Sequence, residues 1–242
     1  MNRIGIIGFG SFGQFIHQFL TPYFDIKVYD THLPKNVIET FDIKKYTLNE
    51  VTNVDVIILC VPVQFLEKTL LEIKGKIKKG TLVIDVSSVK MKPINLMLKH
   101  LPLDVDILGT HPLFGPQSGA NGIKGLNMVI CPVRLNNVKM RFITQFLQDE
   151  LELNLLKRTG EVHDKQMAYV QALTHFIGRA INEMDIPDIE QKTPAYQFLL
   201  DIKKNLGKDS LDLFLTIERE NPYSEEVIGS FMKELHKLKE LI

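Results

Sequence analysis

A glycine-rich hexapeptide near the amino terminus has the residue types and spacing that hold a diphosphate. Gly8 permits a tight turn, Gly10 lets the anion approach the backbone, and Gly13 lets a helix pack closely on a strand. The spacing is informative because an apolar run precedes it and a helical pattern follows it. It predicts a dinucleotide site, and the alternative is a plain strand-to-helix turn. The predicted site comprises Gly8, Phe9, Gly10, Ser11, Phe12 and Gly13.

An acidic residue follows at the distance expected for the ribose of such a dinucleotide. Asp30 ends the next apolar run, where a carboxylate accepts a hydrogen bond from the ribose 2′-OH and repels a 2′-phosphate. It therefore favours NAD over NADP, although His32 and Lys35 leave NADP possible. We also assign Val61 and Pro62, at the end of the third apolar run, to the cofactor site.

Two polar clusters come at the ends of later apolar runs, where open α/β sheets bind ligands. The first, DVSSVK at 85–90, carries two hydroxyls and an ammonium, and the alternative is a helix cap with a solvated lysine. The second, GTHPLFGP at 109–116, holds His111 in a glycine and proline loop just past a strand. A histidine, with a pKa of roughly 6.5, can accept the proton that an alcohol loses as it gives up hydride. The alternative is a purely structural histidine.

A polar stripe recurs at helical spacing in the last third of the chain. It comprises Ala168, Gln171, His175, Gly178, Arg179 and Asn182. The apolar residues of the same helix form a separate face, so the stripe points either to solvent or to a cleft. In a cleft, His175 and Arg179 would contact an anionic substrate.

The elements that position these residues follow from the hydrophobic pattern. Continuous Val, Ile and Leu runs alternate with amphipathic stretches, as in parallel strands covered on both faces. We therefore expect an α/β fold, with a Rossmann-like doubly wound parallel sheet in residues 1–159. Strands are expected at 4–7, 26–29, 54–61, 81–86, 105–108 and 128–131, and helices at 12–20, 64–73, 94–100 and 138–147.

The pattern becomes helical throughout after Thr159-Gly160, which predicts a small all-helical domain in residues 160–242. About 80 residues of helix bury little core alone, so this domain should pack on the first domain or on a second copy, and we expect a homodimer. Helices are expected at 161–184, 195–206, 210–219 and 224–241, the last capped by Ser224.

Composition excludes several classes of partner. Lys plus Arg and Asp plus Glu each number 29, so no net charge attracts nucleic acid. The longest apolar run, 56–63, is too short for a membrane span, and no basic leader precedes the first strand, so we expect a cytoplasmic protein. Cys60 and Cys131 lie far apart in apolar surroundings and are expected to be buried thiols.

Together, four motifs in this order resemble the prephenate dehydrogenase family of tyrosine biosynthesis, over nearly the whole chain. They are GFGSFG at 8–13, DVSSVK at 85–90, GTHPLFGP at 109–116 and QALTHF at 171–176. The resemblance implies oxidative decarboxylation of prephenate to 4-hydroxyphenylpyruvate and CO2 with NAD, or of arogenate to tyrosine. It implies no metal and no lysine Schiff base.

The resemblance also implies roles for individual residues. His111 matches the histidine that hydrogen-bonds the substrate ring hydroxyl and takes its proton as hydride leaves C4. Ser88 matches the serine that hydrogen-bonds the same hydroxyl, and Lys90 a lysine nearby. His175, preceded by Gln171, matches the helix histidine that lines the substrate pocket.

One position departs from the family. Where the family usually offers a helix arginine to a substrate carboxylate, this chain has Asn205, which cannot form a charged fork. We hypothesise that Arg179, Lys203 or Lys204 supplies the cation; alternatively these side chains face water. The helical domain resembles a short form of the family's dimerisation domain. From the length we expect no appended chorismate mutase or regulatory domain.

Two other functions stay open. A different NAD(P)-dependent hydroxy-acid dehydrogenase is supported by Asn205, whereas the pairing of DVSSVK with HPLFGP speaks against it. A non-catalytic dinucleotide-binding sensor is the other, because a fold does not fix a function. The presence of Ser88, His111 and His175 together speaks against the sensor.

Overall fold

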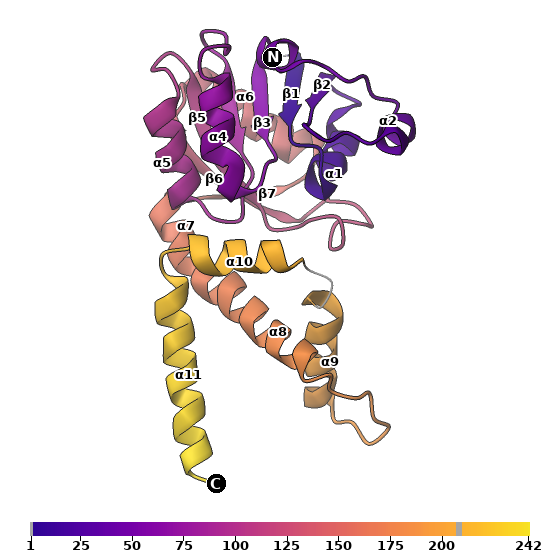
Figure 1. The fold of residues 1–242 in the computed structure, drawn as a ribbon, viewed down its shortest axis with the longest axis vertical. Helices are drawn as coiled ribbons and strands as arrows, with labels where there is room; N and C mark the ends of the chain where they lie inside the picture. The colour runs from indigo at the N-terminus through magenta and orange to yellow at the C-terminus, as the bar shows by residue number, and fades with distance from the viewer. Residues whose placement is uncertain (1, 207–209) are drawn as a thin grey trace. The chain divides into compact units, whose positions relative to one another are not determined.

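The computed structural model describes residues 2–206 and 210–242. The chain forms two compact units, Met1–Glu161 (unit 1) and Val162–Ile242 (unit 2). The division lies close to the one expected after Thr159. Unit 1 carries the sheet and unit 2 is built from helices (Figure 1).

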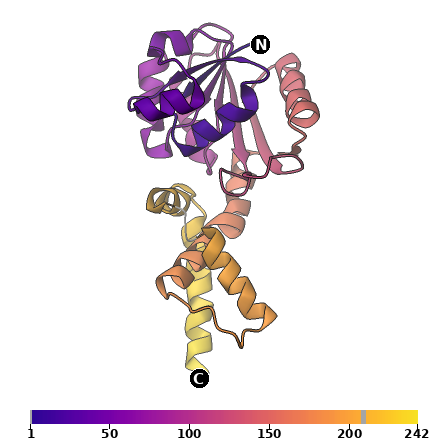
Figure 2. The ribbon, with the colours of Figure 1, turned by 90° about the vertical axis from the view of Figure 1, so that its right-hand side faces the viewer.

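Unit 1 is organised around a seven-stranded sheet in the order β2-β1-β3-β4-β5-β6-β7. Figures 1 and 2 show this sheet with helices on either side. The first five strands run parallel, and their buried Val, Ile and Leu side chains face helices on both sides. The expected α/β class is therefore confirmed. The strands are β1 (Arg3–Ile7), β2 (Asp25–Tyr29), β3 (Val56–Leu59), β4 (Leu82–Asp85), β5 (Asp106–Pro112), β6 (Asn127–Arg134) and β7 (Asn154–Lys157).

Two features of the sheet differ from the prediction of parallel strands throughout. β6 runs antiparallel to β5, because the connection over residues 113–126 consists of turns and irregular chain rather than a crossover helix. β7 pairs parallel with β6 and was missed by the sequence pattern. Its four residues are only half-buried or exposed, so they form no continuous apolar run of the kind that identified the other strands.

Helices cover both faces of the sheet. One face packs against α1 (Ser11–Leu20), α6 (Asn137–Gln145) and the π-helical turn η1 (Phe146–Glu150). The other face packs against α3 (Leu48–Thr52), α4 (Val63–Ile73) and α5 (Met91–His100). The expected helices of this unit are all present, but α2 (Lys35–Phe41) and α3 were missed, because helices this short show little of the helical period.

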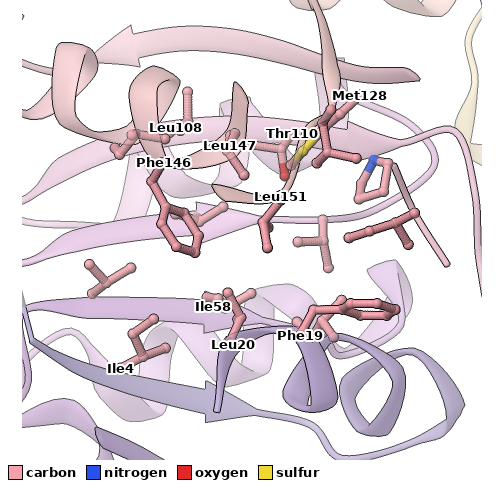
Figure 3. A pocket seen from close by; sticks show the side chains of 18 of the residues that line it. Ile4, Phe19, Leu20, Ile58, Leu108, Thr110, Met128, Phe146, Leu147 and Leu151 are labelled. Carbon is pink, nitrogen blue, oxygen red and sulfur yellow. The ribbon is translucent and has the colours of Figure 1, made fainter. Parts of the chain in front are cut away.

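The face beneath α1 and η1 holds an apolar cavity of about 120 Å³ (Figure 3). Phe19 of α1 and Phe146 of η1 line it from the helices, and Ile58 and Leu108 line it from the strands. Among its described lining residues only Thr110 has a polar side chain, and that hydroxyl donates to the Asp85 carbonyl at 2.8 Å. An anionic ligand would find no partner there, so this cavity is not the predicted site.

Unit 2 consists of helices, with no strand among its described residues. The single helix expected at 161–184 is one continuous helical run with a π-helical middle. A correction concerns Ser224: Tyr223 is the N-cap, and the Ser224 hydroxyl donates instead to the Ile217 carbonyl at 3.3 Å. The elements are α7 (Gly160–Met167), η2 (Ala168–Leu173), α8 (Thr174–Glu183), α9 (Pro194–Leu206), α10 (Leu211–Glu220) and α11 (Ser224–Glu240).

Close packing joins α8 to α9. A Cβ placed on Gly178 would lie 2.7 Å from the Leu206 Cδ1 and 3.2 Å from the Ile202 Cγ2, so glycine is what allows this approach. None of the described helices is long and apolar enough to cross a membrane.

Candidate active site

The predicted site residues of unit 1 gather at one edge of the sheet. Strands β2, β1, β3, β4 and β5 are parallel neighbours in that order, so their carboxyl ends lie side by side. Segments far apart in sequence are thereby brought together at this carboxyl edge. In strand order they are Asp30, the glycine turn 8–13, Val61 with Pro62, Ser87 with Ser88, and His111.

The three glycines of the turn meet three different environments. Gly8 has a φ of +93°, and a Cβ there would lie 2.7 Å from the Cys60 carbonyl oxygen. A Cβ on Gly13 would lie 2.4 Å from the Gly8 carbonyl oxygen, so helix α1 could not approach the turn with any side chain there. A Cβ on Gly10 would have no described heavy atom within 4 Å. Gly8 and Gly13 are thus required by the fold, whereas Gly10 borders open space at the start of α1.

Asp30 ties the turn to the end of β2. Its Oδ2 accepts a hydrogen bond from the Phe9 amide at 2.6 Å, and its Oδ1 accepts one from the His32 amide at 2.8 Å. Each carboxylate oxygen can accept a second bond, so the group keeps capacity for a ribose hydroxyl. His32 and Lys35 are exposed.

The other residues assigned to the cofactor differ in exposure. The Phe9 ring is buried and packs edge-on against Phe41, with centroids 5.5 Å apart, so only its backbone faces the turn. Phe12 is half-buried and Ser11 exposed. Val61 is half-buried and Pro62 is the exposed N-cap of α4.

A buried ion pair lies where β4 ends. The Asp85 and Lys90 side chains are both fully buried, and the Lys90 ammonium donates to Asp85 Oδ2. It also donates to the Thr110 carbonyl oxygen at 2.6 Å. Ser87 donates to Asp85 Oδ1 from its amide at 3.0 Å and from its hydroxyl at 2.5 Å. Ser88 is half-buried beside this network.

The network excludes the alternative for the DVSSVK motif and disagrees with one predicted contact. Lys90 is the N-cap residue of α5, with no side-chain capping bond, so neither a serine cap nor a solvated lysine is present. The predicted substrate contact of Lys90 also disagrees with its surroundings, because its ammonium lies inside the protein against the oxygens of Asp85 and Thr110.

His111 lies within β5, not in a loop past the strand as predicted. It is 5% exposed and pairs with Val129 of β6. Gly109 suggested a strand end, but it lies inside the strand. A Cβ at this position would lie 3.2 Å from the Ile94 side chain of α5, so the glycine leaves room for that side chain to pack on the strand. Side chains alternate along a strand, and Thr110 and Pro112 face the apolar cavity. His111 therefore points to the opposite face.

Asp85 shares that face with His111. Its neighbours Ile84 and Val86 line the cavity, so Asp85 points away from it, and it pairs in register with Gly109, two residues before His111. The sequence analysis included Asp85 in the DVSSVK motif but predicted no role for it. The available signal was a carboxylate that directly follows the buried apolar strand Leu82–Ile84.

Two further groups limit the chemistry of this edge. Burial and the nearby Asp85 carboxylate raise the pKa of the Cys60 thiol, so Cys60 stays protonated at neutral pH and is no nucleophile. Cys131 is a buried thiol in β6. Within the described part of the chain, no group of three or more His, Cys, Asp or Glu side chains could hold a metal ion.

The candidates of unit 2 lie on the long helix and on α9. Gln171 is in η2, and His175 follows in the first turn of α8; both are half-buried. A π-helical segment shifts the side chains that follow it relative to a regular helix, and such segments are frequent at functional sites. This segment coincides with the QALTHF motif.

The three cations offered for the missing arginine differ in their contacts. Arg179 is 36% exposed, pairs with Glu183 at 3.2 Å, and lies 5.7 Å from the Phe214 ring centroid. Lys203 donates to Asp185 at 2.6 Å and holds the pKa of that carboxyl below its ordinary value. Lys204 is exposed, like Asn205, and makes no ion pair with any described residue.

Family and sequence comparisons show what this chain is similar to. A family model described as the nucleotide-binding domain of prephenate dehydrogenase matches residues 32–150, and one described as a TYRAAT1-like C-terminal domain matches residues 180–242. Arogenate dehydrogenase 1, chloroplastic, of Arabidopsis thaliana is 32% identical over 98% of this chain and 38% of its own length. Arogenate dehydrogenase 2, chloroplastic, of the same plant is 30% identical over 93% of this chain. The chain spans 65% of that second relative.

A solved structure agrees in fold along the whole chain. Prephenate dehydrogenase from A. aeolicus, in complex with hydroxyphenyl propionate and NAD+, has a TM-score of 0.75 at 19% identity. The match covers 100% of this chain and 90% of that one. With these matches, the chain belongs to the prephenate/arogenate dehydrogenase family.

Proposed function

We propose that this protein is a dehydrogenase that uses NAD to decarboxylate prephenate oxidatively, with arogenate as the alternative substrate. The supporting observation is the order of the strand ends. From β2 to β5 they present an acid for a ribose, a turn for a diphosphate, and then the Ser88 and His111 side chains. A dinucleotide laid along this edge from Asp30 runs toward the catalytic candidates.

The residues of the turn fit NAD. The space beside Gly10 is the cradle that a Cβ would fill, and it lies at the amino terminus of α1, where a diphosphate is stabilised by backbone amides and the helix dipole. Asp30 favours a free 2′-OH, which distinguishes NAD from NADP. The family model is one of a nucleotide-binding domain, and the A. aeolicus enzyme of similar fold holds NAD+.

The chain's own residues then supply proton transfer and orientation. NAD held by the glycine turn and Asp30 would supply the acceptor for the hydride that the substrate ring loses. His111 accepts the proton of the ring hydroxyl as the C–H electron pair leaves, which converts the hydroxyl carbon to a carbonyl. Ser88 hydrogen-bonds the same hydroxyl and fixes its direction. Loss of the ring carboxylate as CO2 then sends its bonding electron pair through the ring to the carbonyl oxygen, which takes the proton back from His111 and becomes the aromatic phenol.

Unit 2 supplies the substrate-recognition residues in this proposal. Gln171 and His175, on the π-helical turn and the start of α8, are assigned to substrate binding by the family resemblance, and a cation near Asn205 meets a substrate carboxylate. Arogenate is kept as the alternative because both Arabidopsis relatives carry that name. The two substrates share the ring and differ in the keto or amino group of the side chain.

A homodimer is part of the proposal. Apolar side chains of unit 2 are exposed on α11, where Leu235 is 42% and Leu238 60% exposed, and on α9, where Phe198 is 68% exposed. Burying such side chains against a second copy would remove apolar area from water. Sedimentation equilibrium would distinguish dimer from monomer.

One assay tests the activity. NADH absorbance is followed at neutral pH with NAD plus prephenate, then plus arogenate, then plus simple 2-hydroxy acids, and each run is repeated with NADP. We expect turnover with prephenate or arogenate and a preference for NAD. Turnover only with hydroxy acids would replace the proposal by the rival dehydrogenase. Silence with every substrate, together with measurable NAD binding, would replace it by the sensor.

A further inference from the structure

Asp85 is the centre of a buried polar network at the carboxyl edge. Its side chain is fully buried, yet both carboxylate oxygens are used: Oδ1 by the amide and hydroxyl of Ser87, and Oδ2 by the Lys90 ammonium. One carboxylate therefore fixes both the serine turn that follows β4 and the residue that begins α5.

The same network crosses to β5. Lys90 donates to the Thr110 carbonyl at 2.6 Å, and the Thr110 hydroxyl donates to the Asp85 carbonyl at 2.8 Å. That Thr110 carbonyl belongs to the peptide group that joins Thr110 to His111. The bond from Lys90 thus holds the backbone directly before the imidazole, on the sheet face to which Asp85 and His111 both point.

Stability is a poor explanation for this arrangement. A fully buried lysine is rare, and a buried ion pair often contributes no more to stability than apolar residues of the same volume. What such a pair does provide is directional restraint, because each charge must keep its partners.

We infer that Asp85, acting with Lys90, is a positioning residue that fixes Ser88 and His111 relative to each other. Ser88 follows the residue bound to Asp85 Oδ1, and His111 follows the carbonyl held through Oδ2 and Lys90. Lys90 acts through this network and not by touching the substrate. The inference rests on the proposed function for its catalytic meaning, but the geometry that it describes is measurable without substrate.

The opposite edge of the sheet provides a matched control. Lys139 of α6 binds the Asp106 carboxylate and, at 2.5 Å, the Gly80 carbonyl, so it too joins β5 to the residues before β4 through one carboxylate and one carbonyl. This pair lies at the amino ends of the strands, whereas Ser88 and His111 lie at the carboxyl ends. Lys139→Met removes the same kind of restraint away from the candidate site.

The test compares Asp85→Asn, Lys90→Met, the double variant and Lys139→Met in the full chain. We measure kcat and KM for prephenate or arogenate, NAD affinity, melting temperature, and the ring Cε1–Hε1 NMR signal of His111, assigned with His111→Asn. The double variant is included because it should stay folded: removing both buried charges lowers the folding stability less than leaving one charge unpaired.

If Asp85 positions the site, the double variant folds, binds NAD normally, and shows a displaced His111 signal. Its kcat falls about ten- to a hundredfold, the cost of a small misplacement, while KM changes much less. Lys139→Met lowers the melting temperature without moving kcat or the His111 signal.

Two results overturn the inference: a double variant with wild-type kcat and His111 signal, or a Lys90→Met variant whose KM rises while kcat is unchanged. Failure of the proposed function looks different. The wild-type protein would then be inactive on every substrate, while the displacement of the His111 signal would still report on the network.

Discussion

The two units hold their candidate residues by different kinds of contact. In unit 1, Asp85 and Lys90 are fully buried and His111 is 5% exposed, and the bonds that fix them cross between β4, β5 and the start of α5. In unit 2, Arg179 is 36% exposed, and its ion pair is with Glu183, four residues along the same helix.

Contacts of these two kinds restrain a side chain to different degrees. An exposed pair within one helix contributes about 0.3–0.5 kcal/mol and leaves the side chain free to exchange partners. Bonds between separate strands in a dry interior do not exchange without disturbing the sheet. In the proposed function, the fold of unit 1 therefore sets the geometry of proton transfer, whereas unit 2 presents groups that a substrate or a second copy can still rearrange.

Replacing His111 gives the largest effect predicted by this comparison. His111→Asn keeps a polar side chain of similar size but removes the base, so we expect kcat to fall by about a thousandfold. NAD affinity and melting temperature should stay near the wild-type values, because the substitution leaves in place the bonds of Asp85 to Ser87 and of Lys90 to Asp85 and the Thr110 carbonyl. Steady-state kinetics, NAD titration and thermal denaturation measure the three quantities. A variant that keeps a tenth or more of wild-type kcat would remove His111 from the mechanism.

A substitution in the glycine turn should have a smaller effect, on NAD affinity and not on folding stability. Gly10→Val adds a side chain where no described atom lies within 4 Å, so the protein should fold normally. The valine would fill the diphosphate cradle, and we expect NAD binding to weaken by roughly tenfold, about 1.4 kcal/mol.

Gly13→Ala is the matched control for that substitution. Its Cβ would lie 2.4 Å from the Gly8 carbonyl oxygen, and overpacking of this kind costs about 1–3 kcal/mol of folding free energy. Isothermal titration and denaturant melts distinguish the two variants. Equal loss of stability in both would show that Gly10 serves the fold and not the cofactor.

The sequence predicted the helices of unit 2 and most strands of unit 1, but it missed β7, α2, α3 and the direction of β6. Buried parallel strands give unbroken apolar runs, and the turns after them need glycine or a hydroxyl at fixed places, so β1 to β4 and the glycine turn were predictable. The direction of β6 was not, because the pattern of an apolar run does not encode its partner.

The position of Lys90 shows where reasoning from residue type fails. Lysine is usually solvated. Only the structure shows that the Lys90 ammonium is buried and donates to the carboxylate of Asp85, five residues earlier. The π-helical turn of unit 2 likewise has no residue signature, and it became visible only in the backbone hydrogen bonds of residues 168–173.

The cation of unit 2 is the subject of a third prediction, of moderate size. Arg179 and Lys203 already have partners, whereas Lys204 is exposed without a described ion pair. Lys204→Ala should therefore raise KM roughly two- to fivefold, the size of one exposed ion pair, with kcat unchanged. Arg179→Ala serves as the comparison. An unchanged KM in both variants would show that neither Lys204 nor Arg179 replaces the arginine that the family usually has at the position of Asn205.

The smallest effect concerns a buried charge of unit 2 that lacks the pairing seen for Asp85. Both carboxylate oxygens of Glu218 in α10 are inaccessible and accept no hydrogen bond from any described residue, and burial raises the pKa of this group to about 7. A carboxyl with a raised pKa in the folded state stabilises the protein below its ordinary value of 4.5, and that contribution is lost as the pH rises through about 7.

Glu218→Gln removes this titration, so the variant should gain melting temperature over the wild-type protein at pH 8, by a few degrees, and gain less at pH 5. The exposed Glu240→Gln at the end of α11 is the control and should show no such pH-dependent difference. If the wild-type protein and Glu218→Gln differ by the same amount at both pH values, Glu218 does not titrate in this range. The Glu218 carboxylate would then have hydrogen-bond partners in solution. Glu218 and Asp85 would no longer differ in whether their buried oxygens are hydrogen-bonded.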